Sequence, residues 1–460
     1  MKKNYWVVGG VVVAGLALLV PVVNLVVGSP KGTAVTRTAT SDPQLAQAAQ
    51  VLEARCANCH TTDTKMPFYA ALPVAGEIIR KDIDAGRRSM DLTVALYPKD
   101  GGAPSEVALA KIEYEVGRGQ MPPGRYLALH WDGGLSASDK DTLARWIRGT
   151  RIAHYAPAGL PESVAADAVH PIPAKVEVDA RKVALGEKLY HDKRLSGDDT
   201  LSCATCHDLA KGGTDQEKTS RGIRGQMGPI NAPTTYNSMW QTRQFWDGRA
   251  ATLQEQAGGP PLNPVEMGST GWDQIVAKLQ ADEALAREFT AVYPEGFTGK
   301  TITDAIAEYE KTLATPNSKF DRYLAGDAAA LDADEKHGYE VFRSEGCHTC
   351  HVGRLLGGQS FELMGRKADY FADRGNLTPV DEGRYNATKK EEDRRHFKVP
   401  TLRNVALTHP YFHDGTVEDL PAAVRAMAKY EVGRPMSEGD VQVVAKFLRT
   451  LTGQYRGQSL

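Results

Sequence analysis

The sequence predicts a mainly α-helical chain in which one N-terminal transmembrane helix is followed by three small domains of one kind. Two observations predict this architecture. The pattern Cys-x-x-Cys-His occurs three times in the 460 residues and uses all six cysteines. An apolar run covers residues 6–27 and precedes a chain of mixed polarity.

The three motifs indicate covalent haem attachment. They are Cys56-Ala57-Asn58-Cys59-His60, Cys203-Ala204-Thr205-Cys206-His207 and Cys347-His348-Thr349-Cys350-His351. In this spacing the two thiols add to the haem vinyl groups, and the His that follows becomes the proximal ligand of the iron. Zinc sites and disulfides are the alternatives, but neither calls for an adjacent His in three copies. We therefore expect three cytochrome c-like domains that hold three haem c groups.

The apolar run predicts the membrane topology. At about 1.5 Å per residue it reaches roughly 33 Å, which is enough for a hydrocarbon core of about 30 Å. A cleaved signal peptide is the alternative, but the run exceeds the usual apolar stretch of such peptides and no small-x-small cleavage site follows it. Lys2 and Lys3 would stay in the cytoplasm. The chain is therefore expected to be a single-pass protein of the bacterial inner membrane with its body in the periplasm, where haem is attached.

Charge excludes one class of partner. The formal net charge is only -2, so no nucleic-acid partner is expected. The densest charge run, residues 389–398, mixes both signs and is expected to be an exposed loop.

An internal repeat helps to place the domains. Residues 135–150 and 436–450 align without a gap, and each has a Ser at the helix N-cap and an Asp in the first turn. We expect each of these two segments to form the last helix of a haem domain. The expected first helices of the three domains cover residues 45–52, 182–190 and 336–342. The predicted division is a transmembrane anchor at 1–30, a first haem domain at 31–154, a linker rich in Pro and Ala at 155–178, a second haem domain at 179–334 and a third at 335–460.

The sixth iron ligand separates electron transfer from catalysis, because an open iron admits a small oxidant. In the first domain Met121 is the favoured ligand, since the two prolines after it restrict its loop. Met66 and Met90 are competitors, and His130 is a weaker one.

From residue 182 to residue 451 the chain resembles the bacterial di-haem cytochrome c peroxidases. The resembling segments are 228–234 (GPINAPT), 244–249 (QFWDGR), 258–267 (GGPPLNPVEM), 316–323 (PNSKFDRY) and 402–413 (LRNVALTHPYFH). The first domain separately resembles a haem-binding module that contains DIDAGRRSMDL and GQMPPGRYLALH. With the anchor and this extra domain, the chain is similar to the trihaem, membrane-anchored quinol peroxidases.

The resemblance implies ligands for the other two irons. His207 would bind the iron of the peroxidatic haem, and His351 and Met427 would bind the iron of the electron-transferring haem. The alternative for Met427 is packing on a helix face. Related tryptophan-modifying oxidases carry Tyr at this position, so the Met favours a peroxidase.

The resemblance also implies a distal acid–base pair. O–O cleavage needs a group that takes a proton from one peroxide oxygen and returns it to the other. Glu266 matches this group, with Gln256 as its polar orienting partner, and an apolar pocket would raise the pKa of the carboxyl. The alternative for Glu266 is a surface position after a Pro-rich loop. Trp246 matches the indole between the two haems, where it either relays electrons or acts as an apolar spacer.

A calcium site is implied between the second and third haem domains. Asn231, with the backbone carbonyls of Thr408 and Pro410, matches the family's ligands, and oxygen donors suit this cation. One calcium ion is therefore expected.

One position departs from the di-haem pattern. In those enzymes a His closes the peroxidatic iron until the other haem is reduced, and Ile223 occupies the matching place. Ile cannot bind iron, and no other His lies between His207 and His337. Met227 is a conceivable substitute, but we expect an open or water-bound iron, so activation by ligand displacement is in doubt.

The sequence thus predicts a quinol peroxidase. Electrons would pass from membrane quinol to the first haem, then to the haem at His351 and then to the haem at His207, where hydrogen peroxide is reduced to water. The alternatives are a peroxidase supplied by a soluble cytochrome c or a small copper protein, and a non-catalytic multihaem electron-transfer protein. A homodimer is compatible with this prediction.

Overall fold

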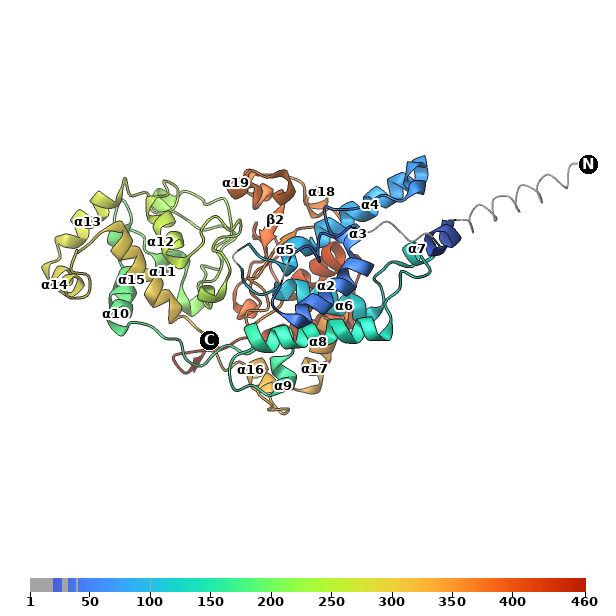
Figure 1. Ribbon diagram of the computed structural model, residues 1–460. Helices are drawn as coiled ribbons and strands as arrows, with labels where there is room; N and C mark the ends of the chain where they lie inside the picture. Colours follow the sequence, from blue (N-terminus) through green and yellow to red (C-terminus); the bar gives the residue numbers. More distant parts are fainter. Residues whose placement is uncertain (1–19, 27–31, 39, 100) are drawn as a thin grey trace, which may run out of the picture. The chain divides into compact units, whose positions relative to one another are not determined.

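The computed structural model describes residues 20–26, 32–38, 40–99 and 101–460 (Figure 1). Helices dominate these residues, so the predicted mainly α-helical class is confirmed. The chain forms two compact units, which we call unit 1 (Met1–Ala156 and Ala165–Ala168) and unit 2 (Pro157–Val164 and Val169–Leu460). The predicted second and third haem domains belong to the same unit.

The predicted transmembrane run lies largely outside the described residues. Of its residues, 20–26 are described and are helical. None of the helices in the described part of the chain has both the length and the apolar character that a membrane crossing requires. The anchor therefore stays a prediction.

Unit 1 is built around the first Cys-x-x-Cys-His motif. Its elements are α2 (Pro43–Arg55), α3 (Ala57–His60), η1 (Phe68–Ala71), α4 (Pro73–Ser89), α5 (Leu92–Leu96), α6 (Glu106–Arg118), α7 (Gly124–Leu127) and α8 (Ala137–His154). The predicted opening and closing helices are α2 and α8, and they pack against each other. Ser136 caps α8, because its hydroxyl accepts a hydrogen bond from Asp139 N at 3.1 Å. Leu52, Leu109 and Trp146 meet in the core.

The first half of unit 2 holds the second motif. A short helix, α9 (Glu162–Ala165), precedes it. Its elements are α10 (Ala180–Tyr190), η2 (Lys193–Leu195), α11 (Cys203–Cys206), η3 (Leu209–Lys211), η4 (Ile223–Gly225), η5 (Ser238–Trp240), α12 (Leu253–Leu262), α13 (Trp272–Gln280), α14 (Glu283–Val292) and α15 (Gly299–Lys311). Leu189, Ile275, Phe289 and Ile306 form its core.

The second half of unit 2 holds the third motif. Its helices are α16 (Lys319–Leu324), α17 (Ala333–Ser344), η6 (Cys347–Thr349), α18 (Tyr370–Arg374), η7 (Pro379–Glu382), α19 (Tyr385–Thr388), η8 (Glu391–Asp393), η9 (Val405–Leu407), α20 (Leu420–Met427), η10 (Ala428–Val432) and α21 (Glu438–Arg449). Two antiparallel pairs of short strands complete it: β1 (Phe361–Leu363) with β2 (His396–Lys398), and β3 (Gln454–Tyr455) with β4 (Gln458–Ser459). Phe320, Phe342 and Phe447 lie in its core.

In both halves of unit 2 the opening helix crosses the closing helix at a glycine. A Cβ on Gly186 of α10 would lie 1.9 Å from Ala305 O of α15, and a Cβ on Gly338 of α17 would lie 2.0 Å from Val443 O of α21. No side chain fits at such distances, so glycine lets the backbones touch. The sequence repeat predicts α8 and α21 but does not reveal α15, which is capped by Thr298 instead of Ser.

The prediction that residues 389–398 form an exposed loop is wrong for the last three of them. These residues form β2, which pairs with β1 in the register Phe361↔Lys398. Phe397 and Lys398 are both buried. Phe397, the aromatic residue within the charged run, is apolar and packs in the core, so the strand that carries it is largely buried.

Candidate active site

Each Cys-x-x-Cys-His motif lies on one short helical turn, in α3, α11 or η6. In each, the His amide donates to the carbonyl of the first cysteine: His60 N to Cys56 O at 3.1 Å, His207 N to Cys203 O at 3.0 Å and His351 N to Cys347 O at 3.0 Å. All six cysteines are free and partly buried. No disulfide joins these cysteines within the described structure.

The three motif histidines share a feature that is typical of metal ligands. Nδ1 of each ring donates to a backbone carbonyl: from His60 to Met90 O at 3.1 Å, from His207 to Gly213 O at 3.4 Å and from His351 to Leu356 O at 2.9 Å. Such a bond fixes the ring and presents Nε2 to a metal. Burial lowers the pKa of all three imidazoles, which keeps them neutral as iron ligands must be. The donor set fits haem.

The candidates for the sixth ligand in unit 1 differ in availability. His130 is buried, and both ring nitrogens are engaged, since Nδ1 donates to Tyr126 O at 2.9 Å and Nε2 accepts from the Tyr69 hydroxyl at 3.0 Å. Met121 lies in the loop between α6 and α7, and its side chain is 36% exposed. Met121 is therefore available to bind iron, whereas His130 would first have to break a hydrogen bond.

Met427 is the last residue of α20 and is directly followed by the π-helical turn η10. The helix buries Leu420, Ala423 and Val424, whereas Met427 itself is only partly buried. Packing against the helix face therefore does not fully explain why a Met occupies this position. In addition, π-helical turns are frequent at functional sites.

Glu266 lies on the loop after α12 and is partly buried. Burial raises the pKa of this carboxyl above its ordinary value, and the positive charge of Arg249 partly opposes the rise. Burial also raises the pKa of the Cys206 thiol to about 11, and the Glu266 carboxylate adds to that rise. Glu266 is thus within electrostatic reach of a cysteine that attaches haem.

Ile223 fixes its own loop against the Glu266 segment. Its backbone N donates to Glu266 O at 2.7 Å. Its buried side chain lies against Gly268, where an added Cβ would be 3.0 Å from Ile223 Cδ1. Gly222 makes the close approach possible, because a Cβ there would lie 1.8 Å from Val265 O. Ile223 is a core residue, and its loop helps to hold the Glu266 backbone in place.

Gln256 lies on α12 and is partly buried. Its backbone N donates to Thr252 O at 3.1 Å. Within the described structure, the Gln256 and Glu266 side chains are not hydrogen-bonded to each other. The orienting role of Gln256 therefore stays a prediction.

Trp246 lies at the junction of the two halves of unit 2. Its Nε1 donates to Asn231 O at 2.9 Å, in the first half. On the other side its ring meets the His413 imidazole, with centroids 6.4 Å apart and planes at 70°, and Lys398 N donates to Trp246 O at 2.8 Å. The indole therefore bridges the parts of unit 2 that carry the second and third motifs.

Asn231 belongs to the same junction, where it contacts the segment that follows Thr408 and Pro410 in the chain. Its N donates to His413 O at 2.8 Å, and its Nδ2 donates to Glu217 O at 3.0 Å. Its Oδ1 accepts no hydrogen bond from any residue that the structure describes. A carbonyl oxygen in this state is a suitable ligand for a hard cation such as calcium.

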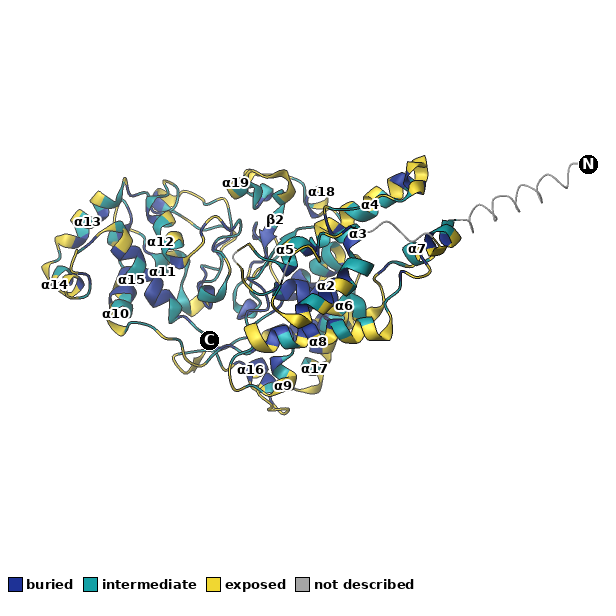
Figure 2. Cartoon of the chain, in the orientation of Figure 1, coloured by how far each residue is buried: buried dark blue, intermediate teal, exposed yellow. Residues whose placement is uncertain are grey.

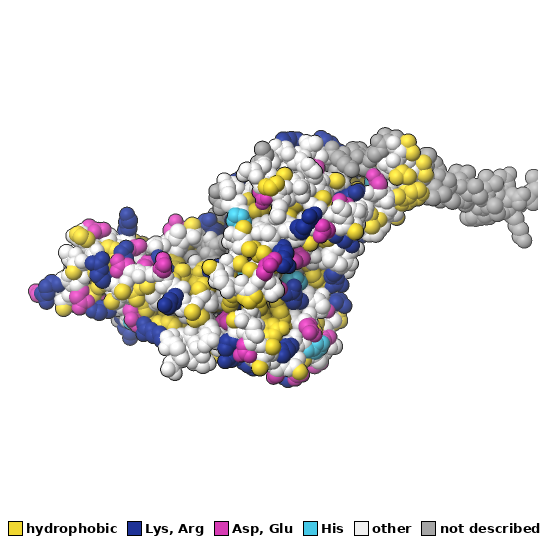
Figure 3. Space-filling model, turned by 60° about the horizontal axis from the view of Figure 1, so that its bottom comes forward, with side chains coloured by type: hydrophobic (Ala, Val, Ile, Leu, Met, Phe, Trp, Pro, Cys, Tyr) yellow, Lys and Arg dark blue, Asp and Glu magenta, His cyan; other side chains and the backbone are white. Residues whose placement is uncertain are grey.

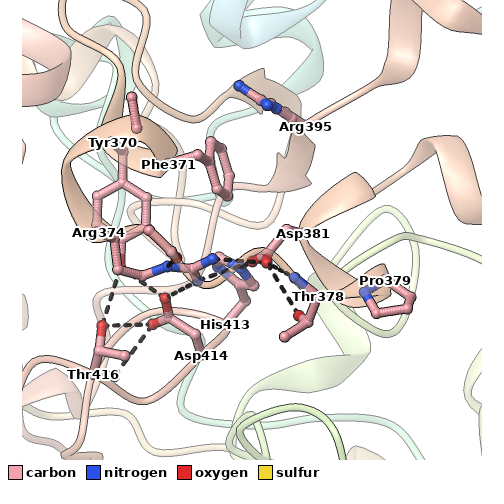
Figure 4. Close-up of polar contacts among 12 residues, drawn as sticks. Tyr370, Phe371, Arg374, Thr378, Pro379, Asp381, Arg395, His413, Asp414 and Thr416 are labelled. Atoms are coloured by element: carbon pink, nitrogen blue, oxygen red, sulfur yellow. Dashed lines mark hydrogen bonds and ion pairs between the residues drawn. The ribbon is translucent and has the colours of Figure 1, made fainter.

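A buried cluster of charged groups lies behind His413 (Figure 4). His413 Nε2 donates to Asp381 Oδ1 at 2.8 Å, and the Arg374 guanidinium donates to Asp381 at 2.7 Å and to Asp414 at 2.5 Å. Asp381, His413 and Asp414 together have the donor atoms for a metal ion. The guanidinium already occupies the cationic position between the two carboxylates, so this cluster does not need a metal.

Sequence reasoning missed this cluster and also missed Lys398. The Lys398 Nζ donates to Gln241 Oε1 and, at 3.0 Å, to Arg243 O. Burial lowers the pKa of the Lys398 ammonium to about 7. The available signal was the place of His413 in the segment LRNVALTHPYFH, but its partners come from other segments, which a linear motif does not reveal.

Two family models match separate parts of the chain. The model described as di-haem cytochrome c peroxidase matches residues 180–329, and the model described as a haem-binding domain matches residues 17–149. These matches include the second and the first Cys-x-x-Cys-His motif, respectively.

Several characterised proteins are similar to this chain. A cytochrome c peroxidase of Escherichia coli is 49% identical over 404 residues, which cover 88% of this chain and 86% of that protein. The cytochrome c551 peroxidase of Nitrosomonas europaea is 45% identical over 303 residues, which cover 65% of this chain and 88% of that protein. A crystal structure of a MauG-like protein associated with microbial copper homeostasis matches with a TM-score of 0.55 and 28% identity, covering 65% of this chain and 95% of that one.

Proposed function

Since this chain belongs to the di-haem cytochrome c peroxidase family and is a haem peroxidase, we propose that it reduces hydrogen peroxide at an open haem held by His207, with electrons from membrane quinol. The observation that carries the proposal is the partly buried carboxyl of Glu266, a residue whose backbone is held by Ile223 and whose charge reaches Cys206. It supplies a proton-transfer group within electrostatic reach of a haem attachment site. An electron-transfer protein without chemistry has no need of one.

The chemistry divides between the haem and the chain. When bound, the haem at His207 supplies electrons to the O–O bond of peroxide. Glu266 takes a proton from one peroxide oxygen and returns it to the other, which leaves as water. Two electrons and two protons convert one peroxide to two waters, and one quinol releases the same number of each when it becomes a quinone.

The electron supply requires the other two motifs. His60 with Met121 would hold a haem that receives electrons from quinol, and His351 with Met427 would hold a haem that passes them on. The bridging position of Trp246 supports a relay between the two halves of unit 2. An anchor over residues 6–27 would keep the first haem near the bilayer, to which quinol is confined.

We also propose one calcium ion at the junction of the two halves, bound by Asn231 Oδ1 and the carbonyls of Thr408 and Pro410. The free Oδ1 of Asn231 supports this proposal. The ion would stabilise the contact between the halves that Trp246 bridges.

A soluble cytochrome c is the second candidate donor, because two relatives are named cytochrome c551 peroxidase. The test compares donors on the purified full chain in lipid nanodiscs. Quinol should be oxidised when peroxide is added, and its oxidation should be faster than that of reduced soluble cytochrome c under the same conditions. Faster oxidation of the cytochrome would show that the cytochrome, and not quinol, is the donor. The peroxidase assignment would still hold.

The position of Ile223 leads to a spectroscopic prediction. Because this buried residue offers no ligand and the Met227 side chain is 53% exposed on the same loop, the haem at His207 should be high-spin ferric in the enzyme as isolated. It should bind cyanide without prior reduction. The measurement is an absorption and electron paramagnetic resonance spectrum with a cyanide titration. Three low-spin haems, with turnover only after reduction, would contradict the expectation.

The raised pKa of Glu266 leads to a pH prediction. Only the ionised carboxylate can accept the first proton, so kcat/KM should fall as the pH drops through the pKa of this group. Because burial raises that pKa above its ordinary value of 4.5, the fall should set in at a higher pH than for an exposed Glu, with a limiting slope of about tenfold per pH unit. The pH profile of the Glu266→Gln variant should lack this limb. If the fall of kcat/KM at low pH persists in the variant, it is caused by the titration of a group other than Glu266.

A further inference from the structure

Exposed apolar side chains gather in three segments of unit 1. The first segment is the helical residues 20–26, the second runs from Met66 to Ile78, and the third contains Trp131. Val26, Phe68 and Val74 are exposed by 78%, 61% and 72%. On the face shown in Figure 3, hydrophobic side chains gather at the N-terminal end of the described chain.

Buried polar contacts hold the three segments together. Asn24 is 3% exposed, its Nδ2 donates to Leu129 O at 2.8 Å, and its side chain is hydrogen-bonded to the Tyr69 hydroxyl. Tyr69 OH in turn donates to His130 Nε2 at 3.0 Å. Because Asn24, Tyr69 and His130 are linked to one another, the exposed residues next to them in the chain, Leu25, Phe68 and Trp131, are brought close together.

No residue of unit 1 that the structure describes covers the face that carries these side chains, and the haem attachment site lies toward the C-terminal end of α4. In the 17-residue helix α4 only Gly76 and Gly86 are buried, and Figure 2 shows the helix exposed along most of its length. Gly86 packs on the backbone of Cys59, where an added Cβ would lie 2.6 Å from Cys59 O. Val74 lies about 18 Å further along the helix, so a haem attached at Cys59 would lie near the opposite end of α4 from Val74.

We propose that this face, formed by Val22, Leu25, Val26, Phe68, Leu72, Val74, Ile78 and Trp131, lies in the interfacial region of a lipid bilayer. The apolar run over residues 6–27 includes the helical residues 20–26, which contribute Val22, Leu25 and Val26 to the face. A membrane entered by that run is therefore next to the face. An exposed Trp beside apolar side chains is typical of the level of the lipid headgroups.

The proposal rests on the proposed membrane anchor and extends it. The anchor alone would tether unit 1 at any orientation, whereas the face sets one orientation. His130 stacks on Tyr126 with centroids 3.8 Å apart, and burial, with a contribution from the nearby Cys59, raises the pKa of Tyr126 to about 12. Tyr69, His130 and Tyr126 thus form a chain of contacts that starts beside Phe68 and comes within electrostatic reach of Cys59, which suits electron uptake from quinol.

The test maps contact between lipid and protein in the full-length, haem-loaded enzyme. The enzyme is placed in nanodiscs that contain a phosphatidylcholine with a photoreactive diazirine near its headgroup, irradiated, and analysed by peptide mass spectrometry. Lipid adducts should form in residues 66–78 and at Trp131. They should be at least roughly fivefold rarer at Leu377, a residue of unit 2 with 60% exposure.

Two double variants test whether lipid contact depends on the apolar character of the exposed side chains. Phe68→Ser with Val74→Ser should lower the adduct yield of residues 66–78 at least roughly fivefold. Phe68→Leu with Val74→Leu should retain it, and Leu377→Ser should change nothing. All three positions are exposed, so none of these substitutions should prevent folding.

Each contrary outcome is distinct. Adducts in residues 6–26 without adducts in residues 66–78 would overturn the proposed face and leave the anchor intact. No adducts at all, with release of the protein by alkaline extraction, would refute the anchor and the face together. Cross-links from residues 66–78 to a second copy of the chain would show a dimer interface in place of a lipid contact.

Discussion

Replacement of Glu266 by Gln is expected to lower peroxide turnover by roughly 100-fold or more while haem content stays unchanged. The amide keeps the size of the carboxyl but cannot accept a proton. Its loss should therefore remove the transfer of a proton between the two peroxide oxygens and leave the attachment turn at Cys206 intact. The measurement is kcat at saturating peroxide, together with the haem absorbance of each preparation.

Glu283→Gln is the matched control, because Glu283 lies in the same half of unit 2, has an 87% exposed side chain and pairs with the exposed Arg287. This variant should keep wild-type turnover. Near-normal turnover in the Glu266 variant would falsify the acid–base role. An equal loss in both variants would point to a general effect of charge.

Replacement of Met121 by Ala is expected to lower peroxide reduction driven by quinol by roughly tenfold or more, because thioether ligation raises the potential of a haem and so its ability to accept electrons. Reduction driven by an artificial donor that reaches the haem at His351 directly should persist. The ratio of the two activities is the quantity to measure. The absorption spectrum should show a changed ligand at one haem.

Met66→Ala is the control, since Met66 is 42% exposed in the same unit and is a competing ligand. It should leave both activities unchanged. If the Met121 variant loses both activities equally, unit 1 has a structural role. If Met66→Ala reproduces the selective loss, Met66 is the ligand.

The sequence predicts those features whose chemistry depends on residues that are close together in the chain. Cys-x-x-Cys-His is set by the haem itself, so all three attachment turns could be placed before the fold was known. Helix caps are also local, and Ser136 and Ser437 cap α8 and α21 as expected. Ile223 was excluded as a ligand from its side chain alone, and the structure adds that it is buried against Gly268.

Features that depend on tertiary contacts could not be predicted in this way. Glu266 is a single acidic residue after a Pro-rich loop, and only the resemblance to known peroxidases singled it out. The pairing of Asp381 with His413 joins residues of two separate segments, so no periodic pattern marks it. Lys398 was misplaced because the charges around it suggest an exposed loop, whereas Phe397 and pairing with β1 bury the strand.

Peroxide reduction by quinol is tested most directly in membrane vesicles that contain the full chain. A peroxide electrode and the absorbance of the quinone are followed together after peroxide is added. We predict that one quinol is oxidised for each peroxide consumed, that the reaction needs both substrates, and that Glu266→Gln vesicles show roughly 100-fold less of it. Quinol oxidation at the same rate without peroxide, or peroxide loss without quinol oxidation, would contradict the proposed function.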